Sequence, residues 1–260
     1  MTKFGQLAKA ADQNRKVLDL YDEYLVSKRS QRKEAEVLHW LLTKNLGDGQ
    51  LGGRDRAGYW SASSAGRCSR EQQFTYLGFK GKATDVQSQN IFDNGDFLHL
   101  RYQVAGIIGG WLTDAEVPVT LSNGSTRVKG TMDGVLEWGE VLELKSINAR
   151  GFAEVVDLGP KRLHRMQATA YMLASGMKRT RFVYENKDRN TNAEFVFDLE
   201  YGYETLVREQ WELLTELTNL QELAPRQPDC INERGMEWRY CQFQQICERA
   251  QFPALKLVLT

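Results

Sequence analysis

Long apolar stretches are missing from this chain of 260 residues. A membrane-spanning helix needs about 20 consecutive, mostly apolar residues, and no run of that kind occurs. The first residues, MTKFGQLAKAADQNRK, also lack the apolar core of roughly 7 to 15 residues that a secretory leader needs. We therefore expect a cytoplasmic protein without a membrane partner.

The chain also lacks a net charge and an ATP-binding motif. Its 34 basic residues balance its 34 acidic residues, which excludes a strong overall field but not a local patch that binds nucleic acid. No GxxxxGK[ST] sequence occurs, so the chain carries no evident ATP-driven motor of its own. Hydrophobic residues make up 42% of the chain, an ordinary fraction for a globular protein.

Cysteine is scarce, and all four cysteines could serve one site. They are Cys68, Cys230, Cys241 and Cys247. In a reducing compartment disulfides are disfavoured, and clustered thiols more often bind metal. Four thiolates suit either a [4Fe-4S] cluster or a structural zinc ion, and the spacing does not distinguish the two.

Periodic patterns divide the chain into an N-terminal extension and a larger α/β part. Residues 7–46 read as helical, and five glycines within residues 47–58 interrupt the pattern. We expect a helical extension with a hinge loop over residues 1–60 and one domain over residues 61–260. Further helices are predicted at 61–79, 90–111, 160–176 and 202–223, and strands at 114–121, 126–137, 140–148, 181–188 and 193–201. This order predicts an α/β fold with a central mixed sheet flanked by helices.

The segment GTMDGVLEWGEVLELKS, residues 130–146, places several charges in a strand-like hairpin. A three-residue turn ending at Gly139 would set Asp133 opposite Glu143, and alternation would set Lys145 on the face of Glu143. Two opposed carboxylates repel each other unless a divalent cation such as Mg²⁺ or Mn²⁺ bridges them. Lys145 could then stabilise charge on a phosphate. Taken alone, the segment fits an exposed hairpin with solvated charges at least as well.

Several short motifs, read in order, resemble those of a known family. GDFLH (95–99), GTMDGV (130–135), ELK (143–145) and QATAY (167–171) resemble the motifs of RecB-type PD-(D/E)xK nucleases. CSREQQFTY (68–76) and the C-terminal cysteines resemble the iron-sulfur branch of that family, which includes CRISPR-associated adaptation nucleases and AddB-type nuclease domains. The resemblance covers roughly residues 61 to 250 and implies a PD-(D/E)xK restriction-endonuclease-like core.

The resemblance implies a role for each matching residue. His99, Asp133 and Glu143 would ligate the catalytic Mg²⁺ or Mn²⁺, the backbone carbonyl of Leu144 would be a further ligand, and Lys145 would be the catalytic lysine.

Supporting residues are expected on the helix that follows. Gln167 and Tyr171 are four residues apart and share a helix face, which the family places beside the catalytic centre. Lys161 and Arg165 would bring phosphate-binding charge nearby. Gln103 departs from the family, which often has an acidic residue there, and this favours weaker or altered metal use.

The resemblance also favours iron-sulfur over zinc at the four cysteines. A [4Fe-4S] cluster would then clasp the N- and C-terminal parts of the nuclease domain together. The family commonly spaces its last three cysteines C-x2-C-x5-C, whereas ten residues separate Cys230 from Cys241 here. Because no cysteine is left over, we expect Cys230 to remain a ligand.

The expected function is that of a metal-dependent DNA exonuclease. It would act on single-stranded or frayed ends, hydrolyse phosphodiesters with a metal-activated water, and depend on a helicase or recombination partner for unwinding. The alternative is a DNA-end-binding or adaptation factor that trims sparingly inside a larger complex. A third reading is a sheet protein whose motifs are structural relics, and the intact Asp133, Glu143 and Lys145 argue against it.

Overall fold

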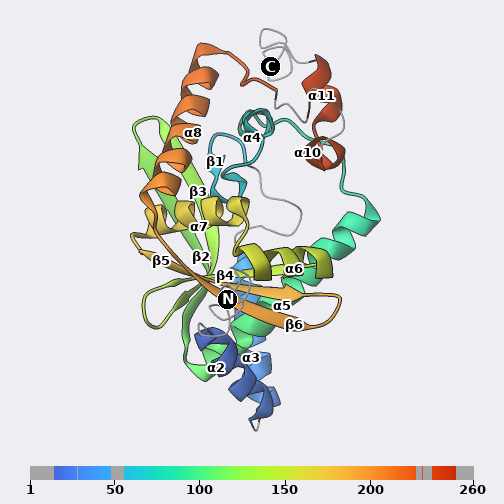
Figure 1. Ribbon diagram of the computed structural model, residues 1–260, viewed down its shortest axis with the longest axis vertical. Helices are drawn as coiled ribbons and strands as arrows, with labels where there is room; N and C mark the ends of the chain where they lie inside the picture. The colour runs from blue at the N-terminus through green and yellow to red at the C-terminus, as the bar shows by residue number, and fades with distance from the viewer. Residues whose placement is uncertain (1–14, 28, 48–55, 227–229, 231–235, 250–260) are drawn as a thin grey trace.

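Six strands form one mixed sheet in the computed structural model, which describes residues 15–27, 29–47, 56–226, 230 and 236–249 (Figure 1). The strands are β1 (Trp60–Ser61), β2 (Leu112–Asn123), β3 (Thr126–Leu136), β4 (Val141–Ile147), β5 (Arg179–Asn186) and β6 (Thr191–Asp198). Their order is β1-β3-β4-β5-β6, and β2 pairs with β3 in addition. The β1–β3 and β4–β5 pairs are parallel and the others are antiparallel, so the predicted mixed sheet is confirmed.

Helices pack on both faces of this sheet. One apolar core includes α6 (Ala149–Leu158), α7 (Arg162–Ser175) and α8 (Tyr201–Leu220). The core on the other face includes α2 (Lys16–Val26), α3 (Gln31–Gly47) and α5 (Val86–Gly109). Because side chains alternate along a strand, Val141 of β4 enters the first core while Leu142 and Leu144 enter the second. The sequence predicts this arrangement, with the two leucines on one face of the sheet and Glu143 and Lys145 on the other.

The N-terminal extension packs on the sheet as part of the same layered structure. The single helix predicted over 7–46 is wrong in one respect, because the chain turns extended at Ser27 and separates α2 from α3. Residues 7–14 and most of the expected hinge loop lie outside the described residues. The buried carboxylate of Glu194 on β6 accepts hydrogen bonds from the amides of Val17 and Leu18, at 3.1 and 2.9 Å, and so caps the first turn of α2.

A smaller apolar cluster lies beyond the sheet. It joins α4 (Ser69–Tyr76) to α11 (Gln244–Arg249), with Phe74 and Phe243 in ring contact and the short α10 (Met236–Tyr240) alongside (Figure 1). The helix predicted over 61–79 covers only α4, since its first residues form β1 and the 3-10 turn Ala62–Ser64. Helix α6 was not predicted. Within the described part of the chain, no helix combines the length and apolarity needed to cross a bilayer.

Candidate active site

The β3–β4 hairpin has the register predicted from its turn. Gly139 adopts the left-handed conformation, with φ of 79°, and the amide of Leu136 donates to the Glu140 carbonyl at 2.9 Å. Gly134 is paired with Leu142, which makes Asp133 and Glu143 the next residues along the two strands. Beyond this point β3 and β4 no longer pair with each other, while β4 remains paired with β5 and β3 pairs with β1. The two carboxylates therefore stand where the strands separate.

Asp133 is held by a backbone amide and faces a histidine from the opposite layer. Its Oδ2 accepts a hydrogen bond from the amide of Leu144 at 2.6 Å, and its Oδ1 lies 3.5 Å from Nδ1 of His99 on α5. Burial, and then the charge of Lys145, lower the pKa of His99, so its imidazole is neutral at pH 7. A neutral imidazole beside a carboxylate is a combination that binds metal. The carbonyl of Leu144 as a further ligand stays a prediction.

Glu116 on β2 is a member of this group that sequence reasoning missed. The pairs Ala115–Gly134 and Val117–Met132 place it opposite Asp133. One ligand atom from each of His99, Glu116 and Asp133 lies within 4.8 Å of the others. Glu116 carries φ of 50°, an unusual value for a residue other than glycine.

Gln103 on α5 holds Glu116 in this position. Its Nε2 donates to Glu116 Oε1 at 2.7 Å and to the backbone carbonyl of Asp133 at 2.9 Å. The side chain is fully buried, and its own Oε1 has no hydrogen-bond partner among the described residues. Since Gln103 replaces the acidic residue that the motif predicts, its amide serves to orient a carboxylate that comes from another strand.

Glu143 and Lys145 form a buried ion pair on the same face of β4. The ammonium of Lys145 donates to Glu143 Oε1, while Glu143 Oε2 is buried without a partner among the described residues. Burial raises the pKa of Glu143 and of Asp133 to about 7. Burial also opposes the charge on Lys145, but Glu143 and Asp133 outweigh this effect and raise its pKa above the usual value.

This donor set fits a hard divalent cation. It offers carboxylate oxygens, one neutral imidazole, and the unpartnered oxygen of Glu143 at the edge of the group. Mg²⁺ and Mn²⁺ prefer such oxygen-rich sites. A bound cation would offset the burial, and the smaller repulsion between carboxylates, that keep the pKa of Asp133 and Glu143 high. The residues present are therefore suited to the metal that the sequence motifs predict.

A row of hydrogen bonds extends from Lys145 into α7. Lys145 Nζ lies 3.4 Å from Gln167 Oε1, and Gln167 Nε2 donates to the hydroxyl of Tyr171 at 3.1 Å. Gly130 leaves room for this arrangement, because a Cβ there would lie 2.8 Å from Tyr171 Cε1. The structure thus brings Gln167 and Tyr171 to the lysine, on one helix face.

The other predicted cations on α7 have protein partners. Lys161 Nζ lies 3.2 Å from Glu154, and Arg165 donates weakly to the carbonyl of Leu158 at 3.5 Å. Arg67, which the sequence did not single out, is close enough to Lys145 for its charge to lower the pKa of that lysine. In the described part of the chain the exposed guanidinium of Arg67 has no ion-pair partner. It is therefore available to an anion beside Lys145.

The four cysteines gather between α4 and α11. The amides of Arg70 and Glu71 donate to the sulfur of Cys68, and Cys230 is near enough to act electrostatically on both Cys68 and Cys241. Burial raises the pKa of Cys68 to about 12 and that of Cys241 to about 11. Cys247 belongs to the small apolar cluster of Phe74 and Phe243. Thiolates at these positions would require cationic compensation, such as that of a metal.

The spacing of the sulfurs bears on the kind of metal. A tetrahedral zinc ion with Zn–S bonds of about 2.3 Å holds its sulfurs about 3.8 Å apart. Among the described residues, the only group of three ligand atoms within 4.8 Å of one another is that of His99, Glu116 and Asp133. No three of the described sulfurs therefore all lie within 4.8 Å of one another.

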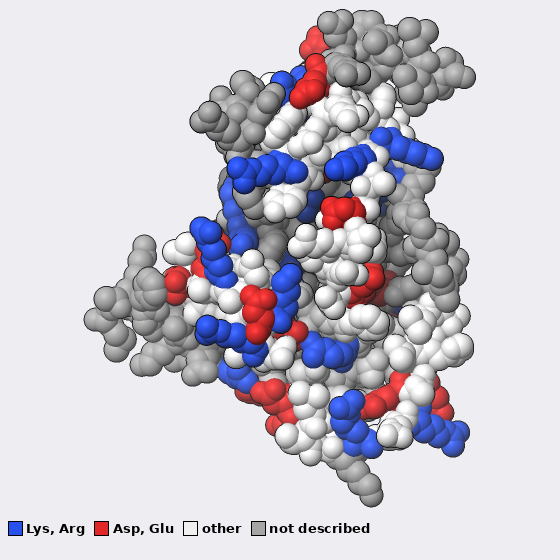
Figure 2. Space-filling model, turned by 90° about the vertical axis from the view of Figure 1, so that its right-hand side faces the viewer, with Lys and Arg blue, Asp and Glu red and all other residues white. Residues whose placement is uncertain are grey.

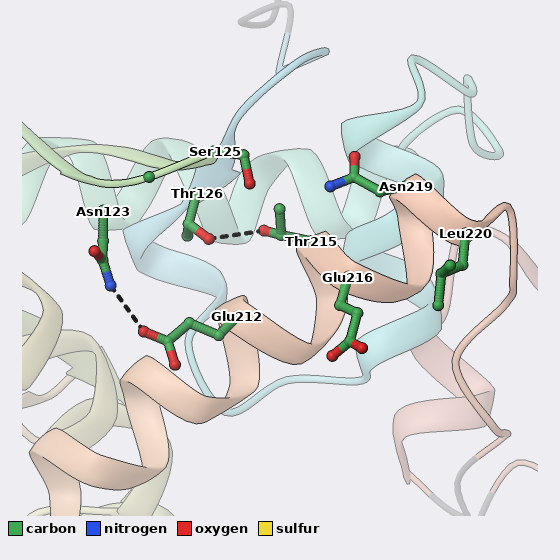
Figure 3. A pocket seen from close by; sticks show the side chains of 9 residues that line it. Asn123, Ser125, Thr126, Glu212, Thr215, Glu216, Asn219 and Leu220 are labelled. Atoms are coloured by element: carbon green, nitrogen blue, oxygen red, sulfur yellow. Dashed lines mark hydrogen bonds between the residues drawn. The ribbon is translucent and has the colours of Figure 1, made fainter.

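A separate hollow of about 390 Å³ lies between the β2–β3 turn and α8 (Figure 3). Two pairs of its polar side chains are hydrogen-bonded, with Asn123 donating to Glu212 at 2.9 Å and Thr126 to Thr215 at 3.1 Å (Figure 3). None of the residues of the candidate active site and none of the cysteines line it.

The chain matches no protein-family model and no curated protein sequence. Its fold is similar to that of a solved structure, "Crystal structure of SSO0001", with a TM-score of 0.52 and 22% identity over 82% of this chain and 96% of that one. A second similar structure is the alkaline exonuclease LHK-Exo from Laribacter hongkongensis, with a TM-score of 0.46 and 18% identity over 64% of this chain and 93% of that one. The same protein in complex with dAMP gives a TM-score of 0.48 and 19% identity. The likeness to SSO0001 establishes a shared fold, and the activity has to be argued from the residues of the chain itself.

Proposed function

We propose that this protein is a metal-dependent nuclease of the PD-(D/E)xK type that hydrolyses phosphodiester bonds at single-stranded DNA ends. One observation carries the proposal: Asp133, Glu143 and Lys145 converge where two strands separate, and a buried oxygen of Glu143 has no hydrogen-bond partner among the described residues. Buried carboxylates with raised pKa values beside a lysine are typical of catalytic sites.

The metal ligands in this proposal are drawn from four elements, namely His99 of α5, Glu116 of β2, Asp133 of β3 and Glu143 of β4. A divalent cation bound there would polarise the phosphate and lower the pKa of a water molecule to provide the nucleophile. Gln103 keeps Glu116 turned toward the cation, and the amide of Leu144 keeps Asp133 in place.

Lys145 is the residue assigned to charge stabilisation. Its ammonium remains protonated beside Glu143 and can donate to a phosphate oxygen as negative charge develops on it. Gln167 restrains the ammonium and is itself held by the hydroxyl of Tyr171. Arg67 provides a second cation on the same side for a neighbouring phosphate.

Replacement of the lysine tests this assignment. With end-labelled single-stranded DNA and Mn²⁺ or Mg²⁺, Lys145→Ala should abolish cleavage while the thermal unfolding curve still shows a folded protein. Lys187→Ala, at an exposed position beyond the end of β5, is the matched control and should cleave like the wild type. Retained activity in Lys145→Ala would contradict the role of this residue.

A DNA-end-binding factor that trims sparingly is the second candidate. It is favoured by Gln103, a neutral residue where the motif predicts an acid. Digestion of labelled single strands, blunt duplexes and covalently closed circles separates the two. Progressive loss from free single-stranded ends supports the exonuclease, and tight binding of ends with little cutting supports the factor.

We further propose that the cysteines hold a [4Fe-4S] cluster, which would tie the segment before α4 to the C-terminal helices. The gathering of all four cysteines supports a shared metal site, and the resemblance of the sequence motifs favours iron-sulfur over zinc. Protein purified without oxygen should be brown and contain iron, and Cys230→Ser should lower the iron content. A colourless preparation that contains zinc would contradict the cluster.

A further inference from the structure

The first three turns of α5 are largely exposed in the described structure. Every residue from 86 to 97 is exposed except Ser88 and Gly95, which are half-buried. Figure 1 shows this part of the helix, in teal, running outward from the sheet layers to the right. It carries two large aromatic side chains, Phe92 and Phe97, which are 56% and 66% exposed. Neither belongs to an apolar core of the described structure.

The two phenylalanines point in different directions. Phe92 precedes His99 by seven residues, or two turns, so the two side chains share a helix face about 10.5 Å apart along the axis. Phe97 is two residues from His99 and lies on the opposite side of the helix. Gly95 lies on the face between Phe92 and His99, and a Cβ there would meet nothing within 4 Å. The same face also carries Asp96, whose carboxylate is close enough to His99 to act on it electrostatically. Between Phe92 and the candidate metal ligand the helix therefore presents only a glycine and an acid.

The charges of this segment show what could lie along that face. From 86 to 98 the helix has no lysine or arginine, and its only charged residues are Asp93 and Asp96. It therefore repels a phosphate backbone. The cations described beside the candidate site come from other elements: Lys145 lies on β4, and Arg67 precedes α4. Elsewhere on this side of the molecule Lys and Arg are interleaved with Asp and Glu (Figure 2), so no uniform field holds the strand there.

A single strand of DNA satisfies both sides of this arrangement. Its phosphates can face Lys145 and Arg67 while its bases, which are uncharged and aromatic, face α5. Unpaired bases stack on exposed aromatic side chains in proteins that bind single strands. The distance of about 10.5 Å corresponds to about three base steps at a rise of about 3.4 Å.

We propose that Phe92 is a stacking platform for an unpaired base about three nucleotides from the scissile phosphate. A base within a duplex is already stacked and paired, so the platform selects single strands. The inference rests on the proposed function, because it takes the strand leading to His99 to be the substrate. It adds a substrate-positioning residue outside the catalytic group.

The test measures binding in a protein that does not cleave. In a Lys145→Ala background with Mn²⁺, fluorescence anisotropy gives the Kd for labelled 12-nucleotide oligothymidylates, each with one abasic residue at a successive position. The unaltered Phe92 protein should bind about five- to hundredfold more weakly when the abasic residue falls at one position near the third nucleotide from the cleaved end. Phe92→Ala should bind the intact strand more weakly by the same factor and show no dependence on the abasic position.

Phe97→Ala is the matched control, with the same residue type on the same helix and a similar exposure. It should retain both the Kd and the dependence on abasic position. Equal scans for the Phe92 and Phe92→Ala proteins would overturn the proposal, as would equal losses in Phe92→Ala and Phe97→Ala. This assay requires no cleavage, so the two proposals can fail separately. If the wild-type protein does not cleave DNA but binding still weakens at one abasic position, the nuclease assignment is refuted and the stacking platform is not.

Discussion

Replacing Gln103 by leucine should cost little stability and much metal affinity. Gln103 touches no substrate in the proposed mechanism, yet its amide holds Glu116 and the backbone of Asp133. Leucine has a similar volume and removes both hydrogen bonds. Glu116 has an unusual backbone conformation, with φ of 50°, and without Gln103 its side chain can turn away from His99.

The structure gives the size of each effect. The bond to the Glu116 carboxylate contributes about 1.5–3 kcal/mol and the bond to the Asp133 carbonyl about 0.5–1.5 kcal/mol. Gln103 Oε1 is buried without a partner, so its removal returns about 1–3 kcal/mol. The net loss of stability is about 1–2 kcal/mol, or a Tm lower by about 4 °C. Loss of a residue that orients a metal ligand typically lowers affinity by about 10- to 100-fold.

Calorimetric titration with Mn²⁺ and thermal unfolding measure the two effects separately. The matched control is Gln73→Leu, because Gln73 is also fully buried and hydrogen-bonded, to Thr218 and Glu222 on the α8 side of the molecule. It should lower Tm without changing the affinity for Mn²⁺. The reasoning is refuted if Gln103→Leu remains folded and binds Mn²⁺ within twofold of the wild type, or if Gln73→Leu weakens binding equally.

Three further predictions concern pH and packing. Since the pKa values of Asp133 and Glu143 are about 7 without metal, Mn²⁺ must displace protons, and its affinity measured by calorimetry should rise steeply between about pH 6 and pH 8. Burial lowers the pKa of His164 from 6.5 to about 3. Between these values the unfolded state binds a proton that the folded state does not, so the stability of the fold decreases as the pH drops from 6.5 toward about 3. His164→Gln should reduce this pH dependence of the free energy of unfolding, measured by denaturant titration. Gly130→Ala should reduce stability by about 1–3 kcal/mol, measured as a lower Tm, because its Cβ would displace Tyr171. The cleavage rate should fall for the same reason.

The hairpin shows how much the sequence could predict. Its turn, its alternation and the side of the sheet that each residue occupies depend on neighbours within a few positions, and the register of Asp133 and Glu143 was correct. The long helices α5, α7 and α8 and the mixed sheet were also predicted. Helix α6 was missed although its apolar residues follow helical spacing. Strand β1 was missed because two residues carry no periodic signal.

Glu116 shows where the sequence was insufficient. It is a single acid in a strand-like segment, without a motif, and its left-handed backbone does not follow from its residue type. Its place opposite Asp133 depends on the β2–β3 register, and its orientation depends on Gln103 from another layer.

The sequence by itself determined the local chemistry of this protein: a hairpin that presents two carboxylates and a lysine on one face, four cysteines, and helices of known periodicity. The motifs had also named His99. Only the tertiary structure decided that Glu116 from β2 joins His99 and Asp133, that Gln103 from α5 holds Glu116 there, and that Phe92 is left exposed. The physical reason is range. Turns and alternation are set by backbone geometry over a few residues, whereas the meeting of separate elements is set by how their apolar faces pack.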